Sequence, residues 1–302
     1  MAKYGDKGPE VAEIQKLLSF LGYGLTSDGE FGDKTLRSLK AFQKKMNLDA
    51  DGVAGSKTIE ALKAAQKRTS KEDKNVAPSK NYSELEIVKT CQLDSSQYIK
   101  QRTEKNKIFI HFTAGGPNAC NVIKYWEKDE PRVATAYVID GNDGKAYECF
   151  HPDYWSFHLG VKGTNGALDK SSIGIEICSY GPLKEVGGKF YAWPADWKTE
   201  VSKDKVYELK EEFRGFKYFQ SYTQDQLNTV EKLLEFLIEE YNITIQKTFD
   251  MSWFEYNEDL ISKKMPGIWT HTNVRKDKSD SYPDQRLLDM LNKLGKKYNT
   301  ND

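Results

Sequence analysis

Apolar residues recur every three or four positions in three stretches of the first 66 residues, which is the spacing of amphipathic helices. Two of these stretches follow copies of one pattern, "DGEFGDKTLRSLKAFQKK" at 28–45 and "DGVAGSKTIEALKAAQKR" at 51–68. Each Asp-Gly supplies a turn in which the glycine can take a positive φ. Three short helices joined by such turns predict a small all-α domain over residues 1–66. Its apolar stripes are Val11, Ile14, Leu17, Leu18 and Leu21, then Leu36, Leu39 and Phe42, then Ile59 and Leu62.

The pattern changes twice after this domain. Residues 67–81, "KRTSKEDKNVAPSKN", are charged and almost free of apolar side chains, which is typical of a linker. From 82 to 302, short apolar runs such as 107–113 and 171–180 alternate with helical stripes such as 223–242. This alternation predicts an α/β domain, a mixed β-sheet flanked by helices. The stretch 185–216 fits no clean period, and we interpret it as an elaborated surface loop beside a cleft.

Composition narrows the classes of partner. Lys plus Arg and Asp plus Glu number 45 each, so net charge favours neither nucleic acid nor an anionic membrane. No window approaches the ~20 apolar residues that span a bilayer, and the first residues lack the apolar core of a signal peptide. We therefore expect a chain that binds neither nucleic acid nor membrane, and we expect a monomer.

The four cysteines are spaced 29 residues apart, at Cys91, Cys120, Cys149 and Cys178. Their sequence contexts share nothing, and no two of them form a C-x-x-C pair. Because the chain shows no export signal, we expect free thiols and no structural disulfide.

Two of the four histidines stand where strands end. His111 closes the apolar run 107–113, and His271 follows the strand-like segment "MPGIWT". A single histidine at such a place is more often structural than functional. Together with Asp280, nine residues beyond His271, the two make a possible three-ligand zinc site, which leaves a fourth position for water.

A carboxylate lies inside the second apolar run. In "SSIGIEICSY" the alternation of a strand places Glu176 on the face opposite the isoleucines. Burying a carboxylate costs several kcal/mol unless it is paired or neutral. Glu176 is therefore a candidate general base, with a structural ion pair as the alternative.

Both domains resemble known families. The turn from Asp28 to Gly32, "KAFQKK" and "DGVAGSKTIEAL" resemble the small peptidoglycan-binding domain of many wall-degrading enzymes. The blocks "FIHFTAGG", "ATAYVIDGNDGKAYECF", "WSFHLG", "SSIGIEI" and "WTHTNVRKDKSD" resemble zinc-dependent N-acetylmuramoyl-L-alanine amidases, whose fold peptidoglycan recognition proteins share. The resemblance implies zinc in a groove that binds bacterial peptidoglycan. A generic helical module that only docks on its neighbour is the alternative for the first domain.

The amidase resemblance assigns roles by position. It implies that His111, His271 and Asp280 are the zinc ligands. The family often has Pro-Gly after the third ligand, and this chain has Ser281-Tyr282. That departure leaves Asp284 as a weaker candidate for the third ligand.

Further roles follow from the same resemblance. Lys278 matches a lysine that stabilises the oxyanion, and Glu176 matches the carboxylate that acts on the attacking water. His158, in "WSFHLG", and Thr113, in "FIHFTAGG", are expected to bind substrate. Thr135 stands where some phage members have a catalytic tyrosine, so that role is absent or taken by Glu176.

We therefore expect hydrolysis of the amide bond between N-acetylmuramic acid and L-alanine of the stem peptide. A non-catalytic recognition protein on the same fold is one alternative, and a muramidase using Glu148 and Glu176 as a carboxylate pair is another. A wall-binding module without an export signal fits a phage endolysin, made in the host cytoplasm and released to the wall. A cytosolic recycling amidase would have little use for residues 1–66.

Overall fold

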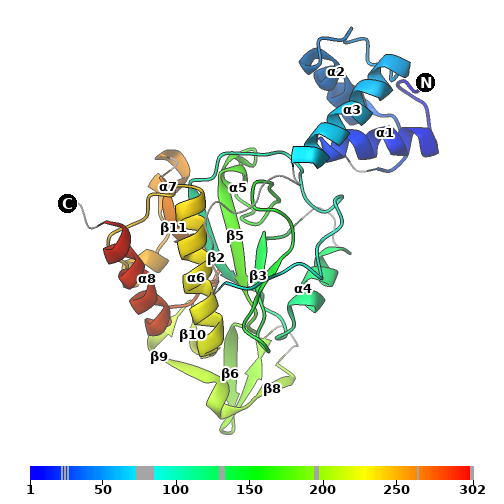
Figure 1. Ribbon diagram of the computed structural model, residues 1–302. Coiled ribbons are helices and arrows are strands. Elements are labelled where there is room, and N and C mark those ends of the chain that lie inside the picture. The colour runs from blue at the N-terminus through cyan, green and yellow to red at the C-terminus, as the bar shows by residue number, and fades with distance from the viewer. Residues whose placement is uncertain are drawn as a thin grey trace. The chain divides into compact units, whose positions relative to one another are not determined.

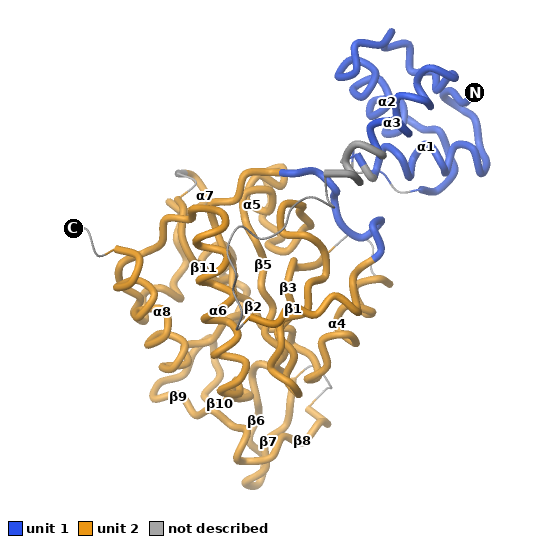
Figure 2. Tube along the Cα trace, viewed as in Figure 1, with its two compact units in different colours: residues 1–80, 94–102 blue, residues 81–93, 103–302 orange. Residues whose placement is uncertain are grey.

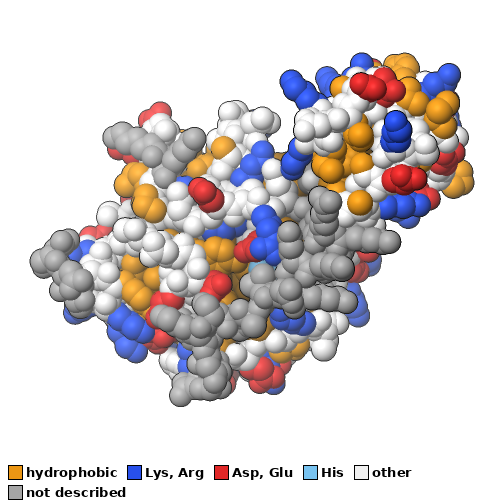
Figure 3. Space-filling view, turned by 45° about the horizontal axis from the view of Figure 1, so that its top comes forward, with side chains coloured by type: hydrophobic (Ala, Val, Ile, Leu, Met, Phe, Trp, Pro, Cys, Tyr) orange, Lys and Arg blue, Asp and Glu red, His pale blue; other side chains and the backbone are white. Residues whose placement is uncertain are grey.

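The computed structural model describes residues 1–21, 23, 25, 27–72, 85–128, 133–193, 197–263 and 265–299 (Figure 1). The chain forms two compact units, Met1–Lys80 with Asp94–Arg102, and Asn81–Leu93 with Thr103–Asp302 (Figure 2). Within the described residues, no helix combines the length and apolar character that crossing a membrane requires. On the face drawn in Figure 3, basic and acidic side chains are interspersed.

The first unit contains the three predicted helices, α1 (Pro9–Phe20), α2 (Asp33–Lys45) and α3 (Ser56–Glu72). Their apolar stripes meet in one core, in which Leu18, Leu39 and Leu62 are fully buried. Helix α3 continues to Glu72, so the predicted linker is helical up to that residue. The rest of that segment, 73–81, lies outside the described residues.

A buried glutamine explains the internal repeat. The side chain of Gln15 donates from Nε2 to Asp28 Oδ1 at 2.7 Å and to Thr35 Oγ1 at 3.0 Å, and its Oε1 accepts from the Gly29 amide at 2.8 Å. The glycine has a φ of 75°, which turns its N–H toward the glutamine. Each D-G-x-x-G-x-K-T copy is thus a turn bound by the helix before it. The second copy repeats the network, with Gln43 bonded to Asp51, Gly52 and Thr58.

The second unit is built on a six-stranded sheet in the order β1-β4-β3-β5-β2-β11. All neighbours are parallel except β3 and β4, which form the predicted hairpin. Helix α6 lies against this sheet beside α8 (Figure 1). Its Gln226 donates to the carbonyl of Cys178 at 2.9 Å. The strands are β1 (Ile87–Val88), β2 (Lys107–Phe112), β3 (Tyr137–Ile139), β4 (Ala146–Glu148), β5 (Ser172–Ile177) and β11 (Gly267–Thr270).

Helices fill the connections of this unit. The α-helices are α4 (Ala119–Trp126), α5 (Ala167–Lys170), α6 (Gln224–Glu240), α7 (Glu258–Lys263) and α8 (Gln285–Tyr298). The 3₁₀ turns are η2 (Lys203–Lys205), η3 (Met251–Phe254) and η4 (His271–Asn273). Strands β2 and β5 are buried along most of their length, which explains why both appear in the sequence as continuous apolar runs.

The prediction of a surface loop over 185–216 is wrong. This segment belongs to a five-stranded antiparallel sheet in the order β8-β7-β6-β10-β9. Its alternation is hard to see in sequence because its buried core is small, with Leu183, Phe190, Ala192 and Val201, and the register shifts between Phe216 and Tyr218. The strands are β6 (Pro182–Val186), β7 (Lys189–Ala192), β8 (Thr199–Val201), β9 (Val206–Phe213) and β10 (Phe216–Gln220).

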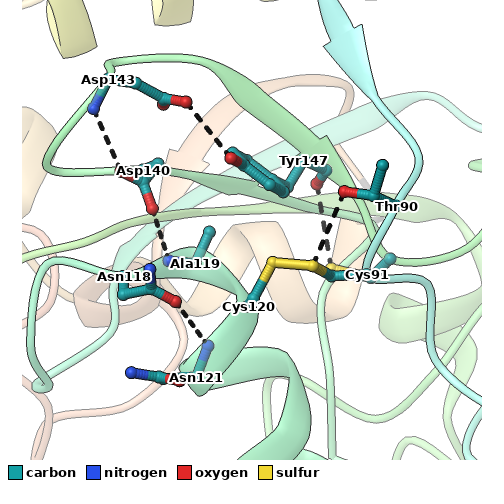
Figure 4. Close-up of a disulfide and its surroundings, with 10 residues drawn as sticks. Thr90, Cys91, Asn118, Ala119, Cys120, Asn121, Asp140, Asp143 and Tyr147 are labelled. Atoms are coloured by element: carbon teal, nitrogen blue, oxygen red, sulfur yellow. Dashed lines mark hydrogen bonds between the residues drawn. A yellow bond between two sulfur atoms is a disulfide. The ribbon is translucent and has the colours of Figure 1, made fainter.

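The expectation that all four cysteines are free is also wrong. Cys91 and Cys120 form a disulfide with their Cα atoms 5.5 Å apart (Figure 4). Cys149 and Cys178 are free and buried. Cys91 follows β1, and Cys120 lies in the first turn of α4, whose N-terminus is capped by Asn118. The disulfide therefore ties the start of α4 to the segment that follows β1.

Removing this disulfide is expected to destabilise the fold without changing the site. A closed loop of 29 residues corresponds to ~3–4 kcal/mol of loop-closure entropy. The double variant Cys91→Ser/Cys120→Ser should lose about that amount in chemical denaturation, and wild type should lose it on reduction. The control is the double variant itself with reductant, whose stability should stay constant. Equal stability of reduced and oxidised wild type would contradict the prediction.

Candidate metal centre

The two histidines and Glu176 share one register row. His111 on β2 pairs with Glu176 on β5, and Ile110 pairs with Thr270 on β11, so His271 lies one residue beyond, level with His111. Residues in one row of a sheet point to the same face. The three side chains therefore project together at the carboxyl ends of three neighbouring parallel strands.

Asp280 meets both histidines. Its Oδ2 lies 2.8 Å from Nδ1 of His111 and 3.0 Å from Nδ1 of His271. The three ligand atoms lie within 4.8 Å of one another, and all three residues are buried. Two imidazole nitrogens and one carboxylate oxygen are a donor set that zinc accepts in catalytic sites. The residues present therefore fit the metal that the sequence predicted.

Asp284, the weaker candidate for the third ligand, has another task. Its Oδ1 accepts from the Arg286 amide at 2.9 Å and so caps α8. Its Oδ2 pairs with the Arg286 guanidinium at 2.6 Å. Both oxygens of the Asp284 carboxylate thus bind groups at the start of α8. Asp280, and not Asp284, lies next to the two histidines.

The remaining ring nitrogens are held by internal partners. Nε2 of His271 lies 2.9 Å from the carbonyl oxygen of Leu159, which can only accept. That nitrogen therefore carries the proton, and Nδ1 keeps its lone pair for a metal. Such outer contacts set the tautomer and ring orientation of metal-binding histidines.

A longer relay sets the tautomer of His111. Its Nε2 lies 3.1 Å from Nδ1 of His158, and Nε2 of His158 lies 2.9 Å from Ser172 Oγ. The serine hydroxyl donates to the Leu168 carbonyl at 2.8 Å, so it accepts from His158. His158 in turn accepts from Nε2–H of His111, and this leaves Nδ1 of His111 unprotonated toward Asp280.

His158 is thus tied to the metal-site histidine through one nitrogen and to the sheet through the other. The sequence suggested a residue of the substrate groove, and the relay adds a positioning contact that no motif indicated. Gly174 makes room for it, since a Cβ there would lie 3.1 Å from His158 Nδ1 and 2.6 Å from Thr135 Cγ2. Thr135 itself is buried, with its hydroxyl donating to the Tyr137 carbonyl at 3.0 Å.

The pKa values of two carboxyl groups at the site, Glu176 and Asp280, are shifted in opposite directions. Burial raises the pKa of Glu176 well above its usual value; the charge of Asp280 adds to the rise and Lys278 opposes it. Burial would also raise the pKa of Asp280, but when His271 and His111 are protonated their charges and hydrogen bonds outweigh burial and hold the pKa below its usual value. Oε2 of Glu176 is buried without a hydrogen-bond partner among the described residues. One carboxyl suits a ligand, and the other suits proton transfer.

The site opens into a cleft of about 580 Å³. Thr113 and Lys278 line it, although the Thr113 hydroxyl also bonds to the Ser179 backbone at 3.2 and 3.3 Å, which joins the ends of β2 and β5. One part of the lining is apolar and comes partly from the second sheet, and another is charged. The apolar residues include Val133, Phe157, Pro182, Trp193 and Phe216, and the charged ones Arg275, Asp277 and Lys278.

Comparison with known proteins shows the family of this chain. A family model described as N-acetylmuramoyl-L-alanine amidase matches residues 101–283, more than half of the chain. The chain belongs to the N-acetylmuramoyl-L-alanine amidase family. A second family model, described as putative peptidoglycan binding domain, matches residues 7–62. No curated protein matches the chain.

Several solved structures are similar to parts of this amidase-family chain. The SleB N-terminal domain is 38% identical over 22% of this chain and 90% of its own, with a TM-score of 0.21. A mutant endolysin from Bacillus subtilis is 15% identical over 70% of this chain and 97% of its own, with a TM-score of 0.40. The endolysin amidase LysCS from Clostridium intestinale is 15% identical over 68% of this chain and 95% of its own, with a TM-score of 0.37.

The carboxylate pair of a muramidase does not form. Glu148 on β4 pairs with Tyr137 on β3, which pairs with Ile175 on β5. Glu148 therefore shares the face of Ile175, and Glu176 points to the opposite face. Glu148 instead bonds to Gln92 and Lys89, each at 3.1 Å.

The relay through His158 makes a testable prediction for metal affinity. His158→Leu should weaken zinc binding about 10- to 100-fold, the usual effect of losing an outer partner of a metal-binding histidine. His158→Gln should stay close to wild type, because its amide oxygen can accept from His111 while its NH₂ donates to Ser172. Chelator competition measures both affinities. Equal affinity of the Leu variant and wild type would refute the relay.

Proposed function

We propose that this protein hydrolyses the amide bond between the lactyl group of N-acetylmuramic acid and L-alanine of the peptidoglycan stem peptide. The observation that carries the proposal is the group of His111, His271 and Asp280 at the base of a cleft, with Glu176 in the same row. Membership of the amidase family supports the bond that is cleaved.

Zinc is the metal we propose for the three ligands. When bound there, it would supply a Lewis acid that activates water and polarises the scissile carbonyl. The protein contributes two imidazoles whose tautomers are set from behind, by Leu159 and by His158. Both Nδ1 lone pairs are thus directed toward the metal without further rearrangement.

Glu176 and Lys278 carry the remaining steps. The raised pKa of Glu176 suits a group that takes the proton of the attacking water and passes it to the leaving amine. Lys278 lines the same cleft and stabilises the negative charge that develops on the carbonyl oxygen. A missing ligand would favour the non-catalytic alternative, and this chain has all three candidate ligands.

The first domain supports action on intact wall. A peptidoglycan-binding module holds the enzyme at an insoluble substrate and raises its local concentration there. We further propose the endolysin route, with synthesis in a host cytoplasm and release to the wall. The Cys91–Cys120 disulfide supports a destination that is oxidising.

Product analysis on purified peptidoglycan tests the proposal. Wild type should release new L-alanine amino termini without new sugar reducing ends, and a chelator or His271→Ala should abolish this. Glu176→Gln should lower kcat by about 10²–10⁴-fold, the usual contribution of general acid–base catalysis, with zinc content unchanged.

Glu148→Gln is the matched control, since it is the same substitution in the same sheet but on the opposite face. Its kcat should stay near that of wild type. Reducing ends among the products, or undiminished release of alanine amines by His271→Ala, would overturn the proposal.

A further inference from the structure

The third ligand comes from a loop and not from the sheet. Asp280 lies between η4 and α8, whereas His111 belongs to β2 and His271 directly follows β11. A ligand on a loop holds its geometry only if neighbouring residues are locked by packing and hydrogen bonds. The two residues after Asp280, Ser281 and Tyr282, are both fully buried.

The ring of Tyr282 is stacked against two aromatic rings, one on strand β10 and one just after it. Phe219, on β10, lies 4.5 Å away by ring centroids with an interplanar angle of 19°. The ring centroid of Tyr222, just after β10, lies 4.7 Å from that of Tyr282, with an interplanar angle of 27°. The Tyr282 hydroxyl also donates to the Gln220 carbonyl at 3.0 Å and accepts from the Tyr222 amide at 3.3 Å.

Ser281 and the start of α8 are held by the same short segment. The Ser281 hydroxyl lies 2.8 Å from the hydroxyl of Tyr222, and both are buried. The Arg286 guanidinium, which pairs with Asp284, also donates to Ser221 Oγ at 3.0 Å. Residues 219–222 thus bind the chain on the C-terminal side of Asp280 at successive points.

We propose that the second sheet positions the third metal ligand through this contact. Tyr222 and Tyr282 are positioning residues: the aromatic stack fixes the backbone after Asp280, and the Tyr222–Ser281 hydrogen bond fixes the peptide next to it. This inference rests on the proposed function, in which Asp280 binds the metal. It gives the sheet of β6–β10 a role in the site that is separate from lining the cleft.

Two variants isolate the contact. Tyr222→Phe removes only the hydroxyl bonded to Ser281 and keeps the stack, whereas Tyr282→Leu removes the stack. Zinc affinity by chelator competition should fall about tenfold or more in Tyr222→Phe and further in Tyr282→Leu. In metal-free protein, hydrogen exchange of the amides of residues 279–282 should be faster in both. Tyr218→Phe, on the same sheet and also the loss of one tyrosine hydroxyl, should match wild type in both measurements.

The outcomes separate this proposal from the proposed function. Wild type that binds no zinc would defeat the metal assignment, while the exchange rates would still test whether the contact holds the loop. Wild-type zinc affinity and exchange in Tyr222→Phe would overturn the positioning role. If Tyr282→Leu does not fold, Ser281→Ala serves as the second variant, since it removes the Tyr222–Ser281 hydrogen bond from the other side and should show the same losses as Tyr222→Phe.

Discussion

The register of three parallel strands is the constraint on which the site depends. One row carries Glu176, His111 and, one residue past the end of β11, His271. A slip of one residue between β2 and β5 would send His111 to the opposite face and separate it from Glu176. The apolar residues of β2 and β5, buried in the sheet, hold this register. The geometry of the candidate metal site thus follows from packing in the core.

The other polar groups of the site are held in place by hydrogen bonds to residues around that row. The histidines are oriented from behind by Leu159 and by His158, and Asp280 is held from its C-terminal side by the second sheet. Glu176 has a raised pKa and a buried oxygen for which the described residues offer no hydrogen-bond partner. A buried carboxyl group without a hydrogen-bond partner lowers the stability of the fold. Its place beside the candidate metal ligands suits a group that transfers protons.

Much of this site could be predicted from the sequence, because strand ends and alternation locate side chains locally. The pattern places His111 and His271 at strand ends and Glu176 inside a strand, and the family resemblance then implies a role for each. The relay through His158 and Ser172 could not be predicted, since it depends on a loop that packs against β5. The Cys91–Cys120 disulfide likewise arises from tertiary proximity, whereas the family resemblance already favours Asp280 over Asp284 as the third ligand. The second sheet could not be predicted, because few of its side chains are buried and its strands β9 and β10 carry a register shift.

Anomalous diffraction at the zinc edge from crystals of the wild-type protein tests the proposed zinc site most directly. The proposed site predicts one strong peak bounded by Nδ1 of His111, Nδ1 of His271 and an Asp280 carboxylate oxygen, each about 2.0–2.2 Å from the metal. A peak elsewhere, or none at these three atoms from protein purified with zinc, would contradict it.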